Sequence, residues 1–165
     1  MPVPAELIQG MSVGMGKGGP MIIESILKSK GSEVRTIEPD ATVAETLHHL
    51  HHERIGALVV SEDKTSIAGI ISDRGIMDAI AGRGVEVLGE RVGSVMTRKV
   101  FTCSRHDRVS AIMALMTNRR IRHIPVVEND GQLCGIVSIG DVVKHQLDEM
   151  QHEADAMREY ISGTR

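Results

Sequence analysis

The run Gly135-Ile-Val-Ser-Ile-Gly-Asp141 places a hydroxyl and a carboxylate where an apolar strand gives way to a predicted helix. A carboxylate has two acceptor oxygens, so Asp141 could accept hydrogen bonds from the two adjacent hydroxyls of a ribose. Ser138 offers a hydroxyl on the same turn, and free backbone N–H groups at a helix start favour phosphate. Asp is also common at helix starts, so a plain capping role for Asp141 is the alternative.

A second group of chemistry-bearing residues is the run from His48 to His52, which holds four histidines. On a helix, His48 and His52 lie four residues apart and could chelate a metal ion. The run follows the polar side of the predicted apolar stripe Val43, Leu47 and Leu50, and no Cys or acidic ligand lies at a fixed spacing. We therefore predict a solvated helix face and no metal site.

Other catalytic and cofactor signatures are weak. Residues 14–19 match G-x-G-x-x-G by letter, but no convincing strand precedes them, as a dinucleotide-binding loop would require. The sequence contains no H-E-x-x-H pattern, and no pair of a nucleophile and a base stands out. We predict no catalytic residues.

An internal repeat organises the elements that must position Asp141. Shifting the chain by 66 residues lays Val34–Gly84 on Val100–Met150 without a gap. Apolar positions match nearly throughout, which is the pattern expected of two copies of one core.

Each copy is predicted to fold as β-α-β-β-α. In the first copy we expect extended residues 34–37, a helix with Asp40 as N-cap, strands at 57–60 and 67–71, and a helix from Ile76. The second copy has the same order, with Asp107 as N-cap, strands at 123–127 and 133–137, and a helix stripe of Val109, Met113 and Met116. A unit of about 50 residues is marginal alone, so we expect the two copies to share one core.

The run 135–141 resembles the G-[IV]-[IV]-[ST]-x-x-D signature of the cystathionine-β-synthase domain, or CBS domain, and Arg122-His-Ile-Pro-Val-Val resembles the middle strand of that family. The resemblance covers roughly residues 21–148 and implies an α/β (α+β) pair of repeats with pseudo-two-fold symmetry, a Bateman module. Such pairs bind adenosine compounds between the repeats: AMP, ADP, ATP, NAD(H) or S-adenosylmethionine. The implied domains are an N-terminal arm at 1–20, repeats at 21–84 and 85–148, and a C-terminal helix extension at 149–165.

By this resemblance, the cleft beside Asp141 and Ser138 takes its base-side wall from the other repeat. The implied wall residues are Thr36, Ile55, Gly56 and Ala57. Arg122 and His123 occupy positions where the family often contacts phosphate.

The first copy departs from the signature, because Gly75 stands where Asp141 has its counterpart. The second cleft therefore lacks its ribose carboxylate. Its implied lining is Ser72, Arg74, Thr102, Ile121, Arg122 and His123. We expect one AMP-type site at Asp141, with this degenerate cleft either empty or roomy enough for part of a dinucleotide such as NAD(H).

Composition limits the remaining possibilities. A formal net charge of -3 and 1% aromatic residues give no basic excess and few stacking platforms for a nucleic-acid polymer. Two cysteines without a C-x-x-C pattern, no apolar run near the ~18 residues of a membrane span, and no signal peptide predict a cytoplasmic protein.

The sequence predicts a regulatory nucleotide-binding module acting on an unknown partner protein. A small enzyme acting on a nucleotide, or a ligand-free scaffold, is the alternative. The apolar positions Val143, Leu147, Met150, Ala154, Met157 and Ile161 form a helical stripe that requires a cover. We expect a homodimer; packing of this helix on its own domain is the alternative.

Overall fold

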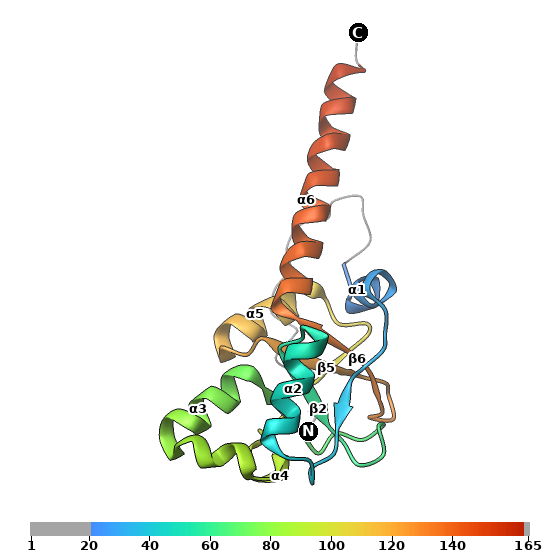
Figure 1. Cartoon of the computed structure of the whole chain (residues 1–165). Coiled ribbons are helices and arrows are strands. Elements are labelled where there is room, and N and C mark those ends of the chain that lie inside the picture. Colours follow the sequence, from blue (N-terminus) through green and yellow to red (C-terminus); the bar gives the residue numbers. More distant parts are fainter. Residues whose placement is uncertain (1–20, 164–165) are drawn as a thin grey trace.

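The computed structural model describes residues 21–163, so the predicted arm at 1–20 lies outside the described residues. Two similar units follow one another (Figure 1). The first unit contains β1 (Thr36–Ile37), α2 (Val43–Glu53), β2 (Ala57–Val60), β3 (Gly69–Ser72) and α3 (Asp73–Arg83). The second contains β4 (Cys103–Ser104), α5 (Val109–Arg119), β5 (His123–Val127), β6 (Leu133–Ser138) and α6 (Ile139–Ser162). The predicted order β-α-β-β-α is confirmed in both units.

Each unit has its own three-stranded sheet, and the two sheets pair in the same way. The middle strand runs parallel to the first and antiparallel to the third, giving the orders β1-β2-β3 and β4-β5-β6. The apolar strands β2 and β5 lie in the centre, where both neighbours satisfy their backbone groups. The predicted hairpins are therefore present, and each third strand leads directly into a helix.

The buried faces of α2 and α5 also correspond. Their buried positions are Val43, Thr46 and Leu50 in α2, and Val109, Ile112 and Met116 in α5. The predicted stripe was wrong at Leu47, which is 38% exposed, and Met113 is only partly buried. Thr46 replaces Leu47 because its hydroxyl donates to the carbonyl of Thr42 at 3.0 Å, which satisfies the hydroxyl inside the core.

The predicted N-caps of these helices were also wrong. Thr42 caps α2 in a reciprocal box with Glu45: the Thr42 hydroxyl accepts from the Glu45 N–H at 3.2 Å, and the carboxylate accepts from the Thr42 N–H at 2.8 Å. Asp40 lies before this cap. Asp107 accepts from the backbone N–H of Ser104 at 2.8 Å and does not cap α5.

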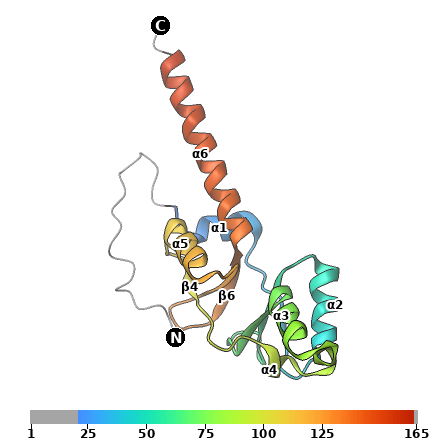
Figure 2. The same cartoon turned by 90° about the vertical axis from the view of Figure 1, so that its left-hand side faces the viewer.

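The expected single shared core is replaced by two cores, each completed by a segment from outside its unit. Helix α1 (Ile23–Lys30) packs on the second sheet, and η2 (Val85–Gly89) with α4 (Val92–Val95) packs on the first (Figure 2). The two contacts are equivalent, because a Cβ at Gly135 would lie 2.8 Å from Leu27 Cδ2 and one at Gly69 would lie 2.6 Å from Met96 Sδ. Helix α1 thus precedes the first unit in the sequence but packs against the second unit, beside β6 and the base of α6.

The two units touch through polar contacts. The guanidinium of Arg122 donates to the carboxylate of Asp73 at 2.9 Å, and the backbone N–H of Leu133 donates to the carbonyl of Thr65 at 2.8 Å. Among residues 21–163, no helix combines the length and apolar character needed to cross a membrane.

Candidate functional site

The turn from β6 into α6 holds Asp141 in a capping box. The Ser138 hydroxyl accepts from the Asp141 N–H at 3.1 Å, and Asp141 Oδ2 accepts from the Ser138 N–H at 2.8 Å. The same Oδ2 also accepts from Lys30 Nζ at 2.6 Å. Lys30 Nζ is fixed by a second bond to the carbonyl of Ile136 at 3.0 Å. A ribose that used both oxygens of Asp141 would therefore have to displace Lys30.

These contacts keep Asp141 ionised. Partial burial pushes the pKa of Asp141 upward, but the hydrogen bonds from Lys30 and from the Ser138 N–H outweigh it. The net result is a pKa below the ordinary value for an aspartate. Lys30 and the Ser138 N–H therefore already stabilise the carboxylate that was expected to accept hydrogen bonds from a ribose.

The matching turn from β3 into α3 has no carboxylate. The Ser72 hydroxyl accepts from the Gly75 N–H at 3.1 Å, as Ser138 does for Asp141. A Cβ at Gly75 would meet Ser72 Oγ at 3.3 Å and no other side chain within 4 Å. Asp73 turns away and binds Arg122, so it does not replace the absent carboxylate. Gly75 therefore leaves open space at the start of α3.

That space belongs to a cavity of about 330 Å³ between the two units. It is lined by Ile70, Ser72, Arg74, Gly75, Asp78, Thr97, Lys99, Val100, Phe101, Arg120, Ile121, Arg122 and His123. Five residues predicted for the degenerate cleft are brought together here: Ser72, Arg74, Ile121, Arg122 and His123. Thr102 does not line the cavity. The volume lies at the lower end of the range for small-molecule sites.

The charged side chains that line the cavity are mostly cationic, as expected of a site that binds an anion, and include one carboxylate. Arg74, Lys99, Arg120 and Arg122 contribute four cationic side chains, against the single carboxylate of Asp78. Asp78 follows Gly75 by three residues on α3, so both residues lie on one face of the helix. This i, i+3 spacing was the signal in the sequence that could have identified Asp78.

Phe101 contributes an aromatic ring to the lining of the cavity, although aromatic residues make up only 1% of the chain. It is the one Phe in the chain, and it lines the cavity just before β4. The guanidinium of Arg119 lies 5.4 Å from its ring centroid, a cation–π distance. No motif marked Phe101 in the sequence, because its counterpart in the first copy of the repeat is Arg35.

The residues predicted for the base-side wall near Asp141 have other contacts. A Cβ at Gly56 would lie 2.9 Å from His123 Cε1, so this glycine makes room for an imidazole. Ala57 is buried at the start of β2, opposite Ser72, and Ile55 and Thr36 are half-buried. Burial, followed by the charge of Arg122, lowers the pKa of His123 below its ordinary value, although Asp73 opposes this. Burial therefore favours the neutral form of the His123 imidazole.

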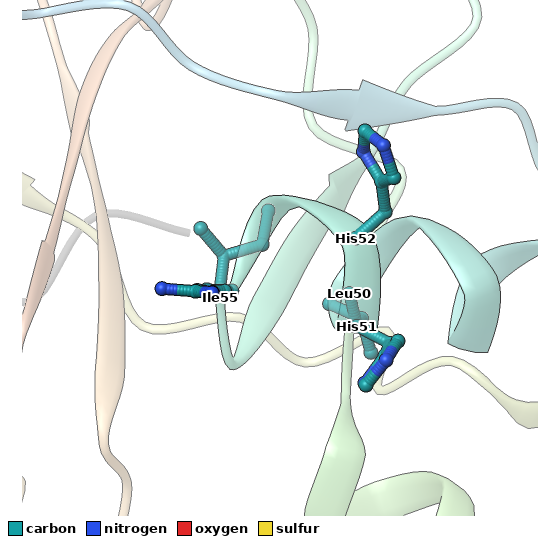
Figure 3. Close-up of a pocket in the computed structure, with 5 residues that line it drawn as sticks. Leu50, His51, His52 and Ile55 are labelled. Atoms are coloured by element: carbon teal, nitrogen blue, oxygen red, sulfur yellow. The ribbon is translucent and has the colours of Figure 1, made fainter.

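A second hollow, of about 490 Å³, lies at the end of α2. Its lining residues are Leu50, His51, His52, Arg54 and Ile55, all from one short segment. Figure 3 shows His51 and His52 pointing in different directions from the helix, so the imidazoles do not converge. His52 stacks on His48 at 6.1 Å, and the described residues contain no group of three potential ligands placed to hold a metal ion.

Comparison with known proteins finds CBS domains in the family model, in a curated relative and in solved structures. The family model described as "CBS domain" matches residues 26–82 and 92–148. The mitochondrial CBS domain-containing protein CBSX3 of Arabidopsis thaliana is 35% identical over 86% of this chain and 72% of its own length.

Two solved structures extend the comparison. A CBS-domain containing protein from Agrobacterium tumefaciens has a TM-score of 0.73 and 39% identity, covering 76% of this chain and 99% of its own. The structure of CBSX2 in complex with AMP has a TM-score of 0.65 and 21% identity, covering 79% of this chain and 98% of its own. The second likeness supports the fold alone.

Proposed function

The chain belongs to the CBS domain family, and from that premise we propose that it is a regulatory module that binds an adenosine phosphate and acts on a partner protein. The two matched domains occupy most of the residues that the structure describes. CBSX2, a protein of the same fold, has been solved with AMP. We propose that this chain is not an enzyme and uses binding alone.

The observation that carries the proposal is the cavity on the Gly75 side. It combines an open volume of about 330 Å³, four cationic side chains, one acidic side chain and an aromatic ring. Cations attract a phosphate through charge-assisted hydrogen bonds, and the half-buried apolar ring of Phe101 suits a purine. We therefore place the principal site beside Gly75, although the sequence signature favoured Asp141.

Each part of the ligand has a matching group. We assign Asp78 to the ribose hydroxyls, because it is exposed in the cavity and no hydrogen bond or ion pair holds it among residues 21–163. Arg120 and Lys99 are assigned to the phosphate and Phe101 to the adenine. Gly75 allows the sugar to approach α3 closely, as a larger side chain would not.

The cleft beside Asp141 is proposed as a weaker, second site. Lys30 must leave Oδ2 before a ribose can use both oxygens, and this ion pair is only about a quarter to a third exposed. Breaking such a bond costs about 1–3 kcal/mol, which weakens binding by roughly one to two orders of magnitude. A dinucleotide such as NAD(H) would make additional contacts in this cleft and recover part of that cost.

Calorimetric titration tests the proposal with AMP, ATP, NAD(H) and S-adenosylmethionine as separate probes. We expect one tight AMP site per chain, and a thermal stabilisation of about 2.7 kcal/mol at one hundred times the dissociation constant. Asp78→Asn should weaken AMP at least tenfold, whereas Asp148→Asn on the exposed part of α6 should not change it. Failure of all four compounds to bind would contradict the proposal and favour a ligand-free scaffold.

Chemical stability of the ligand separates binding from catalysis. AMP and ATP recovered after long incubation with the protein should be unchanged by mass spectrometry. Time-dependent conversion of either nucleotide would favour the alternative of a small enzyme.

A further inference from the structure

Helix α6 continues well past the body of the protein. Its 24 residues span about 36 Å, and its first turns are anchored by the Ser138 cap and by the buried Val142. Both views show the helix running away from the two units (Figures 1 and 2). Every residue from Gln151 to Gly163 is exposed, so the outer half does not pack on its own domain.

One face of this helix is apolar with a regular spacing. The apolar positions lie four, three, four, three and four residues apart: Val143, Leu147, Met150, Ala154, Met157 and Ile161. The large side chains on this face are 41% to 69% exposed. A 4-3 spacing corresponds to the a and d positions of a coiled coil, in which Leu147 takes an a position and Met150 a d position.

We propose that this stripe packs against the same stripe of a second copy of the chain, in a parallel two-stranded coiled coil. The argument for a second copy and for its direction comes from the charges that flank the stripe. With Leu147 at a, the e positions hold Lys144, Gln151 and Arg158, and Glu153 lies at a g position. These side chains border the seam and set the partner and its orientation.

The two orientations place these charges differently. In a parallel pair, each Glu153 faces Arg158 of the partner subunit, because g positions meet the e position five residues further on. In an antiparallel pair that aligns the whole stripe, each Lys144 would face Arg158 of the partner subunit, and the two Glu153 side chains would face each other. The parallel arrangement therefore gains two attractions where the antiparallel one has three repulsions.

The local contacts leave these groups available. Arg158 pairs with Asp155 at 3.2 Å, but its side chain is 77% exposed and this i, i+3 contact is easily exchanged. A parallel coil brings the two carboxyl ends of α6 together and holds both bodies at its other end. The ligand cavities lie in those bodies, away from the seam.

Analytical ultracentrifugation of the full chain tests the proposal. We expect a dimer at micromolar concentration, and Leu147→Asp should give a monomer while His152→Asp, on the opposite face, stays a dimer. Unchanged melting of both variants would show that only association is lost. A wild-type chain that stays monomeric at ~100 times this concentration would overturn the proposal and show that the stripe is covered in another way.

A charge reversal tests the direction. Arg158→Glu should raise the dimer dissociation constant roughly tenfold in a parallel coil, since it faces Glu153, and Glu153→Arg in the same chain should restore it. In an antiparallel coil Arg158→Glu would instead tighten the dimer by pairing with Lys144. An Ile161→Cys chain should also form a disulfide dimer on oxidation, with the wild-type cysteines as background; absence of that cross-link would contradict the parallel direction.

Discussion

The two strand-to-helix turns of this protein share one backbone design but differ in the residue that follows the serine by three positions, which is Gly75 in the first turn and Asp141 in the second. In both turns a serine hydroxyl accepts from the N–H three residues on, at 3.1 Å. Asp141 completes the second turn and is bonded to Lys30, whereas Gly75 leaves the first turn open to a cavity. The turn that matches the family signature is thus occupied by the chain itself, and the turn that departs from it has the free space.

This difference shows that a sequence signature can locate a carboxylate without indicating whether its oxygens are free to bind a ligand. The carboxylate of Asp141 is present and ionised at the start of α6, yet its Oδ2 already accepts two hydrogen bonds. One of these bonds comes from Lys30 at the end of α1, a helix that precedes the first unit but packs in the core of the second. Variants that fill the open turn or free the occupied one separate the two roles.

Filling the open turn should have the largest effect. Gly75→Leu should weaken AMP binding about a hundredfold, because the side chain enters the space proposed for the sugar, a loss of about 2.7 kcal/mol. Gly82→Leu is the matched control, since it lies on the same helix with no side chain within 4 Å. Calorimetry that finds the two variants equal would place the ligand outside this cavity.

Freeing the occupied turn should create binding. Lys30→Met removes the ammonium from Asp141, so a second and weaker AMP binding event should appear in the titration. Lys28→Met removes an exposed ion pair with Glu24 on the same helix and should leave one event. The comparison of the two clefts fails if Lys30→Met abolishes the single event of the wild type.

Removing the carboxylate should affect stability more than affinity. Asp141→Asn weakens the capping box and the bond to Lys30, and we expect a loss of about 1–2 kcal/mol in the free energy of unfolding by urea. AMP affinity should stay within about threefold of the wild type. A tenfold or greater loss of affinity without a change in stability would restore the sequence-based assignment of Asp141 as the ribose ligand.

The smallest effect is a pH dependence confined to the second turn. Because the pKa of Asp141 is lowered in the folded state, its ionised form stabilises the fold at pH values above the unfolded pKa near 4. That contribution disappears as the pH falls through the folded pKa. The stability difference between the wild type and Asp141→Asn should therefore shrink between about pH 5 and pH 2; a constant difference would argue against this cause.

Much of the fold could be predicted from the sequence because it depends on local pattern. The 66-residue repeat, the paired hairpins and the helix order follow from apolar spacing, and the structure confirms them. The stripe failed at Leu47, because Thr46 satisfies its own hydroxyl inside the helix and can be buried. The N-caps failed at Asp40 because the reciprocal pair of Thr42 and Glu45 lies two residues later and satisfies two N–H groups at once.

The site was harder to predict because it depends on contacts between distant segments. Lys30 lies 111 positions from Asp141, and no local pattern predicts their meeting. Lys99 lies just before the second copy of the repeat, and Phe101 aligns with Arg35, so the repeat comparison marks neither as a site residue. Asp78 carried a local signal, its spacing from Gly75, but the signature directed attention to the position of Gly75 itself.

A crystal structure of the full chain with AMP is the most direct test of which cleft holds the ligand. We predict density for the nucleotide in the cavity beside Gly75, with the ribose within hydrogen-bond distance of Asp78 and the Lys30–Asp141 bond intact. Density beside Asp141 with Lys30 displaced, and none beside Gly75, would contradict the account.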